Sequence, residues 1–374
     1  MSRLEELIQQ YCPDGVEYMP LGKACLMERG TSATKGTMQT GEIPVISGGK
    51  QPAFYCDKSN RTGETITVAG SGAGAGYVQY WNEPIFVCDA FSIKGNDGLM
   101  TKYIYYYLTS IQERIYATKK GGGVPHVHIS SIDKFEIPVP PLPVQEEIVR
   151  ILDNFAELQA ELQAELQKRL QQYNYYRDKL LSFNDLNGGG YAVSVEWKKL
   201  GDVCELGTGS HNTQDGLTEG QYPFYTRGSE VLYLNDYDYD ETAIITAGDG
   251  AGVGKVFHFV KGKYALHQRA YRIVPNEKEV LPRFVYYYIG ATFYDYIMRN
   301  SVSSSVVSIR RPMMVNCPIP VPPLAEQQRI VDILDRFDTL ANDITAGLPA
   351  EIEARRKQYE YYRDTLLTFN RKNV

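Results

Sequence analysis

The chain alternates between short apolar segments with strand-like spacing and longer segments with helical spacing. At its start, Leu4, Leu7, Ile8 and Tyr11 recur at intervals of three and four residues, which predicts an amphipathic helix over residues 2–11. A Pro-Asp-Gly turn follows at once and ends this helix. The next hundred residues carry short β-type runs separated by glycine and polar residues, which is typical of a β-rich domain.

Two glycine-rich runs, 69–76 and 247–254, each lie between two short apolar segments of β-type composition. The flanking segments are 65–68, 77–81, 243–246 and 255–259. A strand, a glycine run and a strand predict a hairpin or bulged turn whose backbone positions only glycine can adopt. The runs do not favour a nucleotide-binding loop, because neither opens a helix or ends in Gly-Lys-Ser/Thr.

A long helical pattern covers residues 144–183. Three tandem copies of Ala-Glu-Leu-Gln occupy residues 156–167 and place Leu158, Leu162 and Leu166 on one slowly drifting stripe. A continuous helix of this length would span ~60 Å at about 1.5 Å per residue. The residues predicted to pack helix against helix are Leu158, Leu162, Leu166, Leu170, Leu340, Ile344, Leu348 and Ile352.

This helical segment occurs twice. The sequence Ile-Pro-Val-Pro-Pro-Leu stands at 137–142 and again at 319–324, and Tyr-Tyr-Arg-Asp-x-Leu-Leu stands at 175–181 and again at 361–367. The offset between the copies grows from 182 to 186, so the second copy has gained four residues, close to one helical turn. Because Pro349 lies in the inserted region, we expect a kink or a restart of the second helix there.

The β-rich segments repeat as well, beginning at Val16 and Val195. We therefore predict an α+β fold in which two tandem, mixed but β-rich domains are separated by two long antiparallel helices, with a pseudo-two-fold internal repeat. The predicted divisions are 1–143 (N-terminal helix and first domain), 144–184 (central helix), 185–324 (second domain) and 325–374 (C-terminal helix). The loops 119–126 and 299–305 have matching flanks and different contents, which indicates two domains of one fold with separate specificities.

Composition narrows the class of protein. The six cysteines form no Cys-x-x-Cys pair, so zinc ribbons and a disulfide framework are not expected, and reduced cytoplasmic thiols are. We expect no membrane span and no signal peptide. The net charge of −6 counts against a nucleic-acid partner, but the helical segments hold most of the excess, so the domains can still present basic faces.

The Pro-Pro-Leu corners, Gln145 and Gln327, the Ile-Val…Leu-Asp helices and the Tyr-Tyr-Arg-Asp endings resemble the specificity subunit of type I restriction-modification systems. The resemblance implies that each domain is a target-recognition domain for one half of a bipartite duplex DNA site. It also implies that the helices set the half-site spacing and dock two methyltransferase subunits for adenine methylation, with two translocase-nuclease subunits completing the enzyme. The chain itself would be non-catalytic, with no cofactor of its own; S-adenosylmethionine, ATP and Mg²⁺ would be bound by the partners.

Basic and polar residues near the variable loops are the candidates for DNA contacts, arginine for guanine and lysine for phosphate. They are Lys50, Arg61, Lys119, Lys120, His126 and His128 in the first domain, and Arg227, Lys255, Arg269, Arg272, Arg299, Asn300, Arg310 and Arg311 in the second. A metal site at His126 and His128 is disfavoured because no third ligand lies nearby in the sequence. The clustered tyrosines are expected to pack between helix and domain rather than to stack on bases.

Two other functions remain open. A protein-binding scaffold that does not contact DNA would keep the fold and fits the acidic net charge; a two-domain nucleotide-dependent transferase comes third. The Ala-Glu-Leu-Gln copies add a hypothesis about the spacer: one further copy would lengthen the helix by ~6 Å and rotate it by about 40°, favouring half-sites farther apart.

Overall fold

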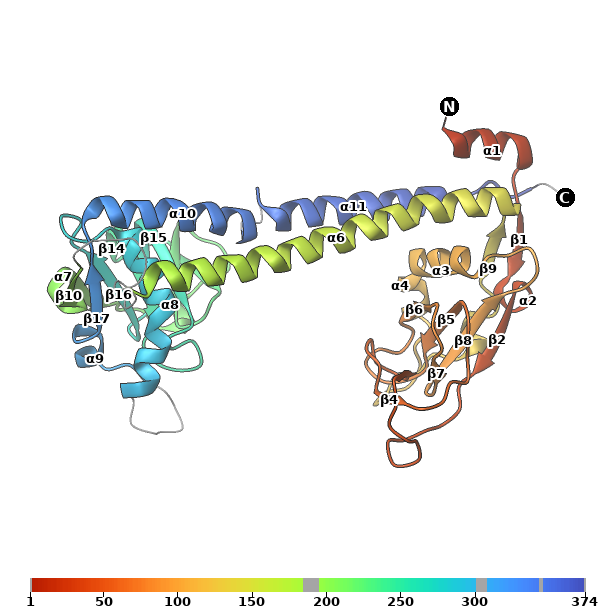
Figure 1. Ribbon diagram of the computed structural model, residues 1–374, viewed down its shortest axis with the longest axis horizontal. Helices are drawn as coiled ribbons and strands as arrows, with labels where there is room; N and C mark the ends of the chain where they lie inside the picture. The colour runs from red at the N-terminus through yellow and green to blue at the C-terminus, as the bar shows by residue number, and fades with distance from the viewer. Residues whose placement is uncertain (1, 184–194, 301–307, 343–345, 373–374) are drawn as a thin grey trace. The chain divides into compact units, whose positions relative to one another are not determined.

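The computed structural model describes residues 2–183, 195–300, 308–342 and 346–372 of the chain. The chain divides into two compact units (Figure 1): unit 1 combines residues 1–163 with residues 351–374, and unit 2 is residues 164–350. Each unit holds one of the two β-rich domains with part of each long helical segment, so the predicted α+β class is confirmed. The predicted divisions cut the chain differently, at the ends of the helices, and stay a prediction.

Unit 1 begins with α1 (Arg3–Tyr11), the helix predicted from the apolar spacing, and continues into a β-rich domain. Its strands form three sheets, ordered β1-β9, β2-β8-β5-β6 and β4-β3-β7. The strands are β1 (Glu17–Pro20), β2 (Cys25–Arg29), β3 (Ile43–Ile46), β4 (Phe54–Cys56), β5 (Thr65–Ala69), β6 (Val78–Trp81), β7 (Phe86–Val87), β8 (Ala90–Gly95) and β9 (Glu136–Val139). The short helices are α2 (Leu21–Ala24), α3 (Thr101–Ser110), α4 (Gln112–Tyr116) and α5 (Ile129–Ile132).

Unit 2 contains a domain with a similar order of elements. Its strands are β10 (Glu196–Lys199), β11 (Cys204–Thr208), β12 (Tyr222–Tyr225), β13 (Val231–Leu234), β14 (Tyr239–Ala247), β15 (Phe257–Leu266), β16 (Ala270–Pro275) and β17 (Pro318–Val321). Its domain helices are α7 (Leu200–Val203), η1 (Thr213–Asp215), α8 (Pro282–Asn300) and α9 (Arg311–Val315). Strands β10 and β17 pair with each other, and the other six form one sheet, ordered β11-β16-β14-β15-β12-β13.

One strand accounts for the difference between the two sheet systems. In unit 1, β6 pairs with β5 and the separate β7 pairs in parallel with β3. In unit 2, the single strand β15 does both, because its first part pairs with β14 and its last two residues pair in parallel with β12. Two sheets in unit 1 therefore correspond to one continuous sheet in unit 2, and the strand neighbours are otherwise the same.

The long helical segments have the predicted continuity. Helix α6 (Leu142–Leu181) is uninterrupted, whereas the second copy is split into α10 (Leu324–Asn342) and α11 (Leu348–Leu366), so the restart expected near Pro349 is confirmed. Of the predicted packing positions, Leu158, Leu162, Leu166, Leu170, Leu348 and Ile352 are partly buried, Leu340 is exposed, and Ile344 lies outside the described residues. No helix in the described ranges is long and apolar enough to cross a membrane.

Within each unit, two helices run side by side at equivalent positions. In unit 1, the rings of Phe155 and Tyr362 stack with centroids 5.4 Å apart, so the first part of α6 lies against α11. In unit 2, the rings of Tyr176 and Phe337 stack at 5.6 Å, so the last part of α6 lies against α10. Each pair joins the same two positions of the repeat, with the roles of the two copies exchanged.

A buried glutamine fastens each long helix to its domain. Gln145 accepts a hydrogen bond from the Met100 N–H at 2.9 Å and donates to the carbonyl oxygens of Gly98 and Pro140 at 2.9 and 2.7 Å. Gln327 makes the equivalent three bonds with Leu281, Glu279 and Pro322 at 2.8, 2.9 and 2.8 Å. Because burial leaves an amide no water to bind, these bonds satisfy Gln145 and Gln327 and fix where each helix leaves its sheet.

The C-terminal segment completes unit 1. The Val16 N–H donates to the Asn370 carbonyl and the Lys372 N–H donates to the Val16 carbonyl, both at 2.9 Å. The Tyr18 hydroxyl donates to the Phe369 carbonyl at 2.9 Å, so the end of the chain lies along the entry to β1 (Figure 1). Both ends of the sequence therefore build the same unit.

Candidate nucleic-acid interface

The glycine-rich runs form the predicted turns. In unit 1 the run joins the antiparallel strands β5 and β6, and in unit 2 it joins β14 and β15. Gly72 and Gly76 have φ values of 78° and 83°, and their counterparts Gly250 and Gly254 have 84° and 67°. These angles lie in the left-handed region, where a side chain is strained, so the expectation that only glycine fits these positions is confirmed.

Equivalent backbone hydrogen bonds hold the two turns. The Gly70 N–H donates to the Asp89 carbonyl at 3.0 Å, and the Gly248 N–H donates to the Arg269 carbonyl at 2.8 Å. The other side of each turn is also matched: Val127 donates to the Gly70 carbonyl, and Ile309 donates to the Gly248 carbonyl.

These matched backbone hydrogen bonds show which positions of the first domain are equivalent to which positions of the second. Isolated bridges join Ser71 to His126 and Asp249 to Ser308, so these pairs correspond as well. Turn face 1 is defined as Arg29, Ser71, Asp89, His126 and His128, and turn face 2 as Arg227, Asp249, Arg269, Ser308 and Arg310. The backbone hydrogen bonds of the two faces are equivalent, and the side chains that the faces present are different.

Turn face 1 borders a polar hollow of about 550 Å³. Asp89, His126, His128 and Arg29 line it, and the Ser71 hydroxyl donates to the Asp89 carboxylate. The rings of His126 and His128 are stacked, with centroids 5.9 Å apart and an interplanar angle of 3°. The described residues contain no group of three or more His, Cys, Asp or Glu side chains arranged to hold a metal ion.

Turn face 2 is built around Asp249. Its carboxylate accepts hydrogen bonds from Arg227 at 2.8 Å and from Arg269 at 3.1 Å. Burial would raise the pKa of Asp249, but these two guanidinium groups outweigh it and lower that pKa below its usual range. The Arg269 side chain is 62% exposed, so its charge faces solvent while its position is held by Asp249.

A buried histidine, His267, hydrogen-bonds to the backbone of Arg269. His267 Nδ1 accepts a hydrogen bond from the Arg269 N–H at 2.9 Å, and the side chain is 3% exposed. Burial lowers the pKa of His267, and the nearby charges of Arg227 and Arg269 lower it further. The neutral ring that accepts this bond is therefore the favoured form.

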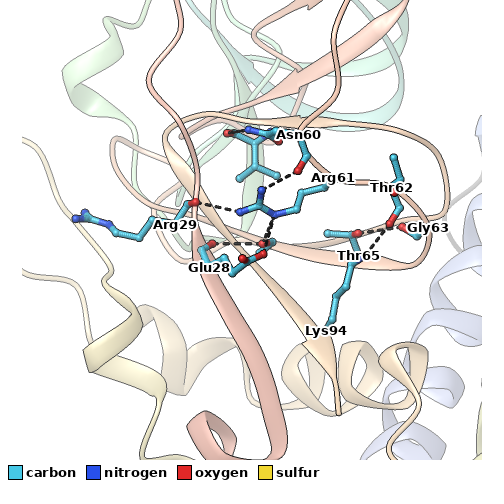
Figure 2. Close-up of polar contacts among 10 residues, drawn as sticks. Glu28, Arg29, Asn60, Arg61, Thr62, Gly63, Thr65 and Lys94 are labelled. Atoms are coloured by element: carbon cyan, nitrogen blue, oxygen red, sulfur yellow. Dashed lines mark hydrogen bonds and ion pairs between the residues drawn. The ribbon is translucent and has the colours of Figure 1, made fainter. Parts of the chain in front are cut away.

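Two of the predicted DNA-contacting arginines are held inside the protein. The Arg61 guanidinium donates to the Ser92 hydroxyl at 2.7 Å and to the carbonyls of Asn60 and Arg29 at 2.7 and 3.1 Å (Figure 2). Glu28 adds an ion pair at 3.4 Å. Arg272 is paired with Glu205 and, at 3.0 Å, with Glu241, and its side chain is 11% exposed.

The remaining predicted residues lie at or near the surface. Lys50, Lys119 and Lys255 rest over the rings of Tyr77, Tyr116 and Tyr294, at 5.1, 4.1 and 5.2 Å from the ring centroids. The exposed side chains of this group are those of Lys50, Lys120, Lys255, Arg299, Asn300, Arg310 and Arg311. Arg299 and Asn300 are the last two residues of α8 and the first two of the second variable loop. Arg310 is the N-cap residue of α9, and Arg311 is the first residue of that helix.

Sequence reasoning missed five members of the two faces: Arg29, Ser71, Asp89, Asp249 and Ser308. The alignment of the glycine runs already placed Ser71 over Asp249. Extending this alignment to place Asp89-Ala90-Phe91 over Arg269-Ala270-Tyr271 would also have paired Asp89 with Arg269. Arg29 left no such signal; the structure shows its side chain pointing away from Arg61 (Figure 2) and lining the hollow.

Comparison with known proteins gives one consistent result. A family model described as "Type I restriction modification DNA specificity domain" matches residues 13–172 and again residues 193–354. The specificity subunit of the type I restriction enzyme EcoR124I/EcoR124II from Escherichia coli is 34% identical, with 99% of this chain and 97% of that one covered. A putative type I specificity subunit from Haemophilus influenzae is 29% identical over 95% of this chain and 96% of its own.

Solved structures agree in fold. The crystal structure of a type I restriction-modification S subunit from M. genitalium matches with a TM-score of 0.67 and 19% identity, covering 94% of this chain and 96% of that one. A chain from a study of complex assembly and conformational transition of the type I system matches with a TM-score of 0.58 and 17% identity, covering 97% and 99%.

Proposed function

The chain belongs to the family of type I restriction-modification specificity subunits, and on that premise we propose that each of its two domains reads one half of a bipartite site in duplex DNA. Specificity subunits are the non-catalytic components of these complexes, and they act together with partner subunits. The single observation that carries the proposal is the pair of turn faces, where equivalent backbone frames present different polar side chains. A protein that reads two different half-sites with one fold needs that arrangement.

The side chains available at each face fit contacts with DNA. Face 2 and its neighbours Arg311 and Lys255 are rich in guanidinium and ammonium groups, which bind phosphate and guanine. Face 1 has Lys119 and Lys120 beside it, with His126, His128 and Arg29 around the hollow. The proposed interface leaves out Arg61 and Arg272, because internal acceptors already hold their guanidinium groups.

The helices supply a surface for the partner subunits in this proposal. Tyr175 on α6 and Tyr361 on α11 occupy equivalent positions of the repeat and are 60% and 67% exposed, unusually open for large aromatic side chains. We assign these tyrosines to the docking of two methyltransferase subunits. S-adenosylmethionine, ATP and Mg²⁺ would be bound by the methyltransferase and translocase-nuclease subunits and not by this chain.

Replacing both tyrosines tests the docking surface. The Tyr175→Ala/Tyr361→Ala variant should bind the methyltransferase roughly 10- to 100-fold more weakly, measured by titration of the full chain, because exposed aromatic anchors carry much of an interface's affinity. Its thermal unfolding should be unchanged, since neither ring is buried. Glu157→Ala, at an exposed position of α6, is the matched control. Equal affinities for wild type and variant would remove these tyrosines from the docking surface.

The half-site proposal is tested by mapping adenine methylation across the genome in cells with and without this gene. The expected result is a methylated motif of two short halves around a fixed gap, which disappears on deletion. The purified complex should also bind that duplex with a steep dependence on salt, because lysine and arginine contacts release counterions from phosphate. An unchanged map with the partner genes expressed would instead favour the protein-binding scaffold, which the net charge of −6 supports.

A further inference from the structure

At one pair of equivalent positions, the first domain has a hydrogen-bond acceptor and the second domain has a hydrogen-bond donor. The carbonyl groups of Asp89 and Arg269 accept the same backbone hydrogen bond from the glycine turn, so the two residues correspond. The residue that faces each across the turn corresponds too: Ser71 hydrogen-bonds to Asp89, and Asp249 hydrogen-bonds to Arg269. The position occupied by Asp89 and Arg269 thus carries a carboxylate in the first domain and a guanidinium in the second.

In domain 1, this position presents an acceptor. Asp89 is exposed, and the Ser71 hydroxyl donates to one of its carboxylate oxygens. A carboxylate has more acceptor sites than a single hydroxyl can fill, so Asp89 can still take a donor from outside. On the edge of a base pair, the donor that aspartate or glutamate accepts is the cytosine N4 amino group.

In domain 2, the same position presents donors. Arg269 is bonded to Asp249 through Nη1, and Arg227 holds the other carboxylate oxygen of Asp249. The Arg269 side chain is 62% exposed, and no described residue accepts from its remaining N–H groups. The fork of N–H groups on a guanidinium matches the O6 and N7 acceptors of guanine.

We propose that the position shared by Asp89 and Arg269 is a base-specificity determinant, with Asp89 selecting a cytosine in one half-site and Arg269 a guanine in the other. Ser71 and Asp249 are positioning residues that orient the two reading groups. This inference rests on the proposed function, since it needs each domain to contact one half-site.

The test substitutes each reading group by an amide, because asparagine and glutamine pair with adenine. Asparagine keeps the length of aspartate, and glutamine is shorter than arginine. Asp89→Asn and Arg269→Gln are each expressed with the wild-type partner subunits, and the methylated motif is mapped. Asp89→Asn should change one cytosine of one half-site and leave the other half unaltered. Arg269→Gln should change one guanine of the opposite half-site. Preference for the original base should fall roughly 10- to 100-fold in each variant.

Controls separate the possible failures. Asp97→Asn and Lys261→Gln, at exposed positions of the same two domains, should leave the motif unchanged. If the wild type gives no bipartite motif, the proposed function itself fails. If the wild type gives one and both amide variants keep it, the inference is overturned.

A variant that abolishes methylation is examined further. The purified complex is then offered a duplex library with each half-site randomised in turn. Unchanged base preference in both halves overturns the inference, and a change confined to one position of the expected half supports it.

Discussion

At the residue scale, the two buried glutamines Gln145 and Gln327 each make three hydrogen bonds that hold a long helix to its domain. Each satisfies an N–H and a carbonyl from one domain loop together with the carbonyl of the proline five residues before it, and each is fully buried. The chain uses an amide because the corner between strand and helix leaves both donors and acceptors without backbone partners.

Gln145→Leu should therefore destabilise unit 1 by about 2–4 kcal/mol, since the Met100 N–H and two carbonyls would be left unpaired in the interior. Urea unfolding of the full chain, followed by a probe in unit 1, measures the loss. Gln163→Leu, at an exposed position on the same helix, should change stability by less than about 0.5 kcal/mol. Similar losses in the two variants would contradict the role given to Gln145.

His267 makes the stability of unit 2 depend on pH. Burial and two nearby arginines lower its pKa below the ordinary 6.5, so the folded state holds the neutral ring while the unfolded state takes up a proton more readily. The stability from His267 is present above the ordinary pKa and is lost as pH falls from there towards the lower, folded value. His258, whose pKa burial also lowers, acts in the same direction.

Unit 2 should thus lose stability as pH falls below the ordinary histidine pKa of 6.5, as followed by its thermal unfolding. His267→Gln should flatten this dependence, although it lowers stability at neutral pH. An equally steep pH dependence in the variant would assign the effect to other groups.

At the element scale, the glycine turns show what could be predicted. The strands on either side, the turn and its glycines followed from local sequence, because backbone conformation there is decided within a few residues. The restart at Leu348 followed from Pro349 for the same reason. The engagement of Arg61 could not be predicted, because its acceptor Ser92 is 31 residues away and is placed by the sheet. The fusion of two sheets through β15 was equally out of reach, since it depends on strand pairing across the domain.

Gly250 and Gly290 both have open space around them, so substitutions there test the effect of backbone conformation on stability without a packing clash. A Cβ at Gly250 or at Gly290 would meet no atom within 4 Å, but Gly250 has a φ of 84° and Gly290 lies inside α8. Gly250→Ala should cost about 1–2 kcal/mol, because L-residues are strained in the left-handed region. Gly290→Ala should stabilise by about 0.5–1 kcal/mol, since alanine favours a helix over glycine. Chemical unfolding of both variants tests the opposite signs, and a loss in both would mean that backbone strain is not the cause.

At the scale of the whole molecule, the proposed function connects the recognition of DNA to the length of a helix. Helix α6 is continuous through all three Ala-Glu-Leu-Gln copies, and the second copy of the repeat consists of α10 and α11. Under the proposed function, the gap between half-sites is then a property of the helices and not of the turn faces. Changes in the spacer and changes at Asp89 or Arg269 should have independent effects on the motif.

Inserting a fourth Ala-Glu-Leu-Gln copy after Gln167 tests this separation. Four residues add ~6 Å and rotate the following helix by only about 40°, so the apolar stripe is nearly kept. The methylated motif should retain both half-sites and widen its gap by at most about two base-pair steps of ~3.4 Å. Replacing one copy by a different helix-forming tetrapeptide should leave the gap as it was. A two-residue insertion turns the stripe by about 200° and should instead disrupt the helix pairing and abolish methylation. If the four-residue insertion leaves the gap unchanged, the helix does not set the spacing, and the distance between half-sites must be fixed by the partner subunits.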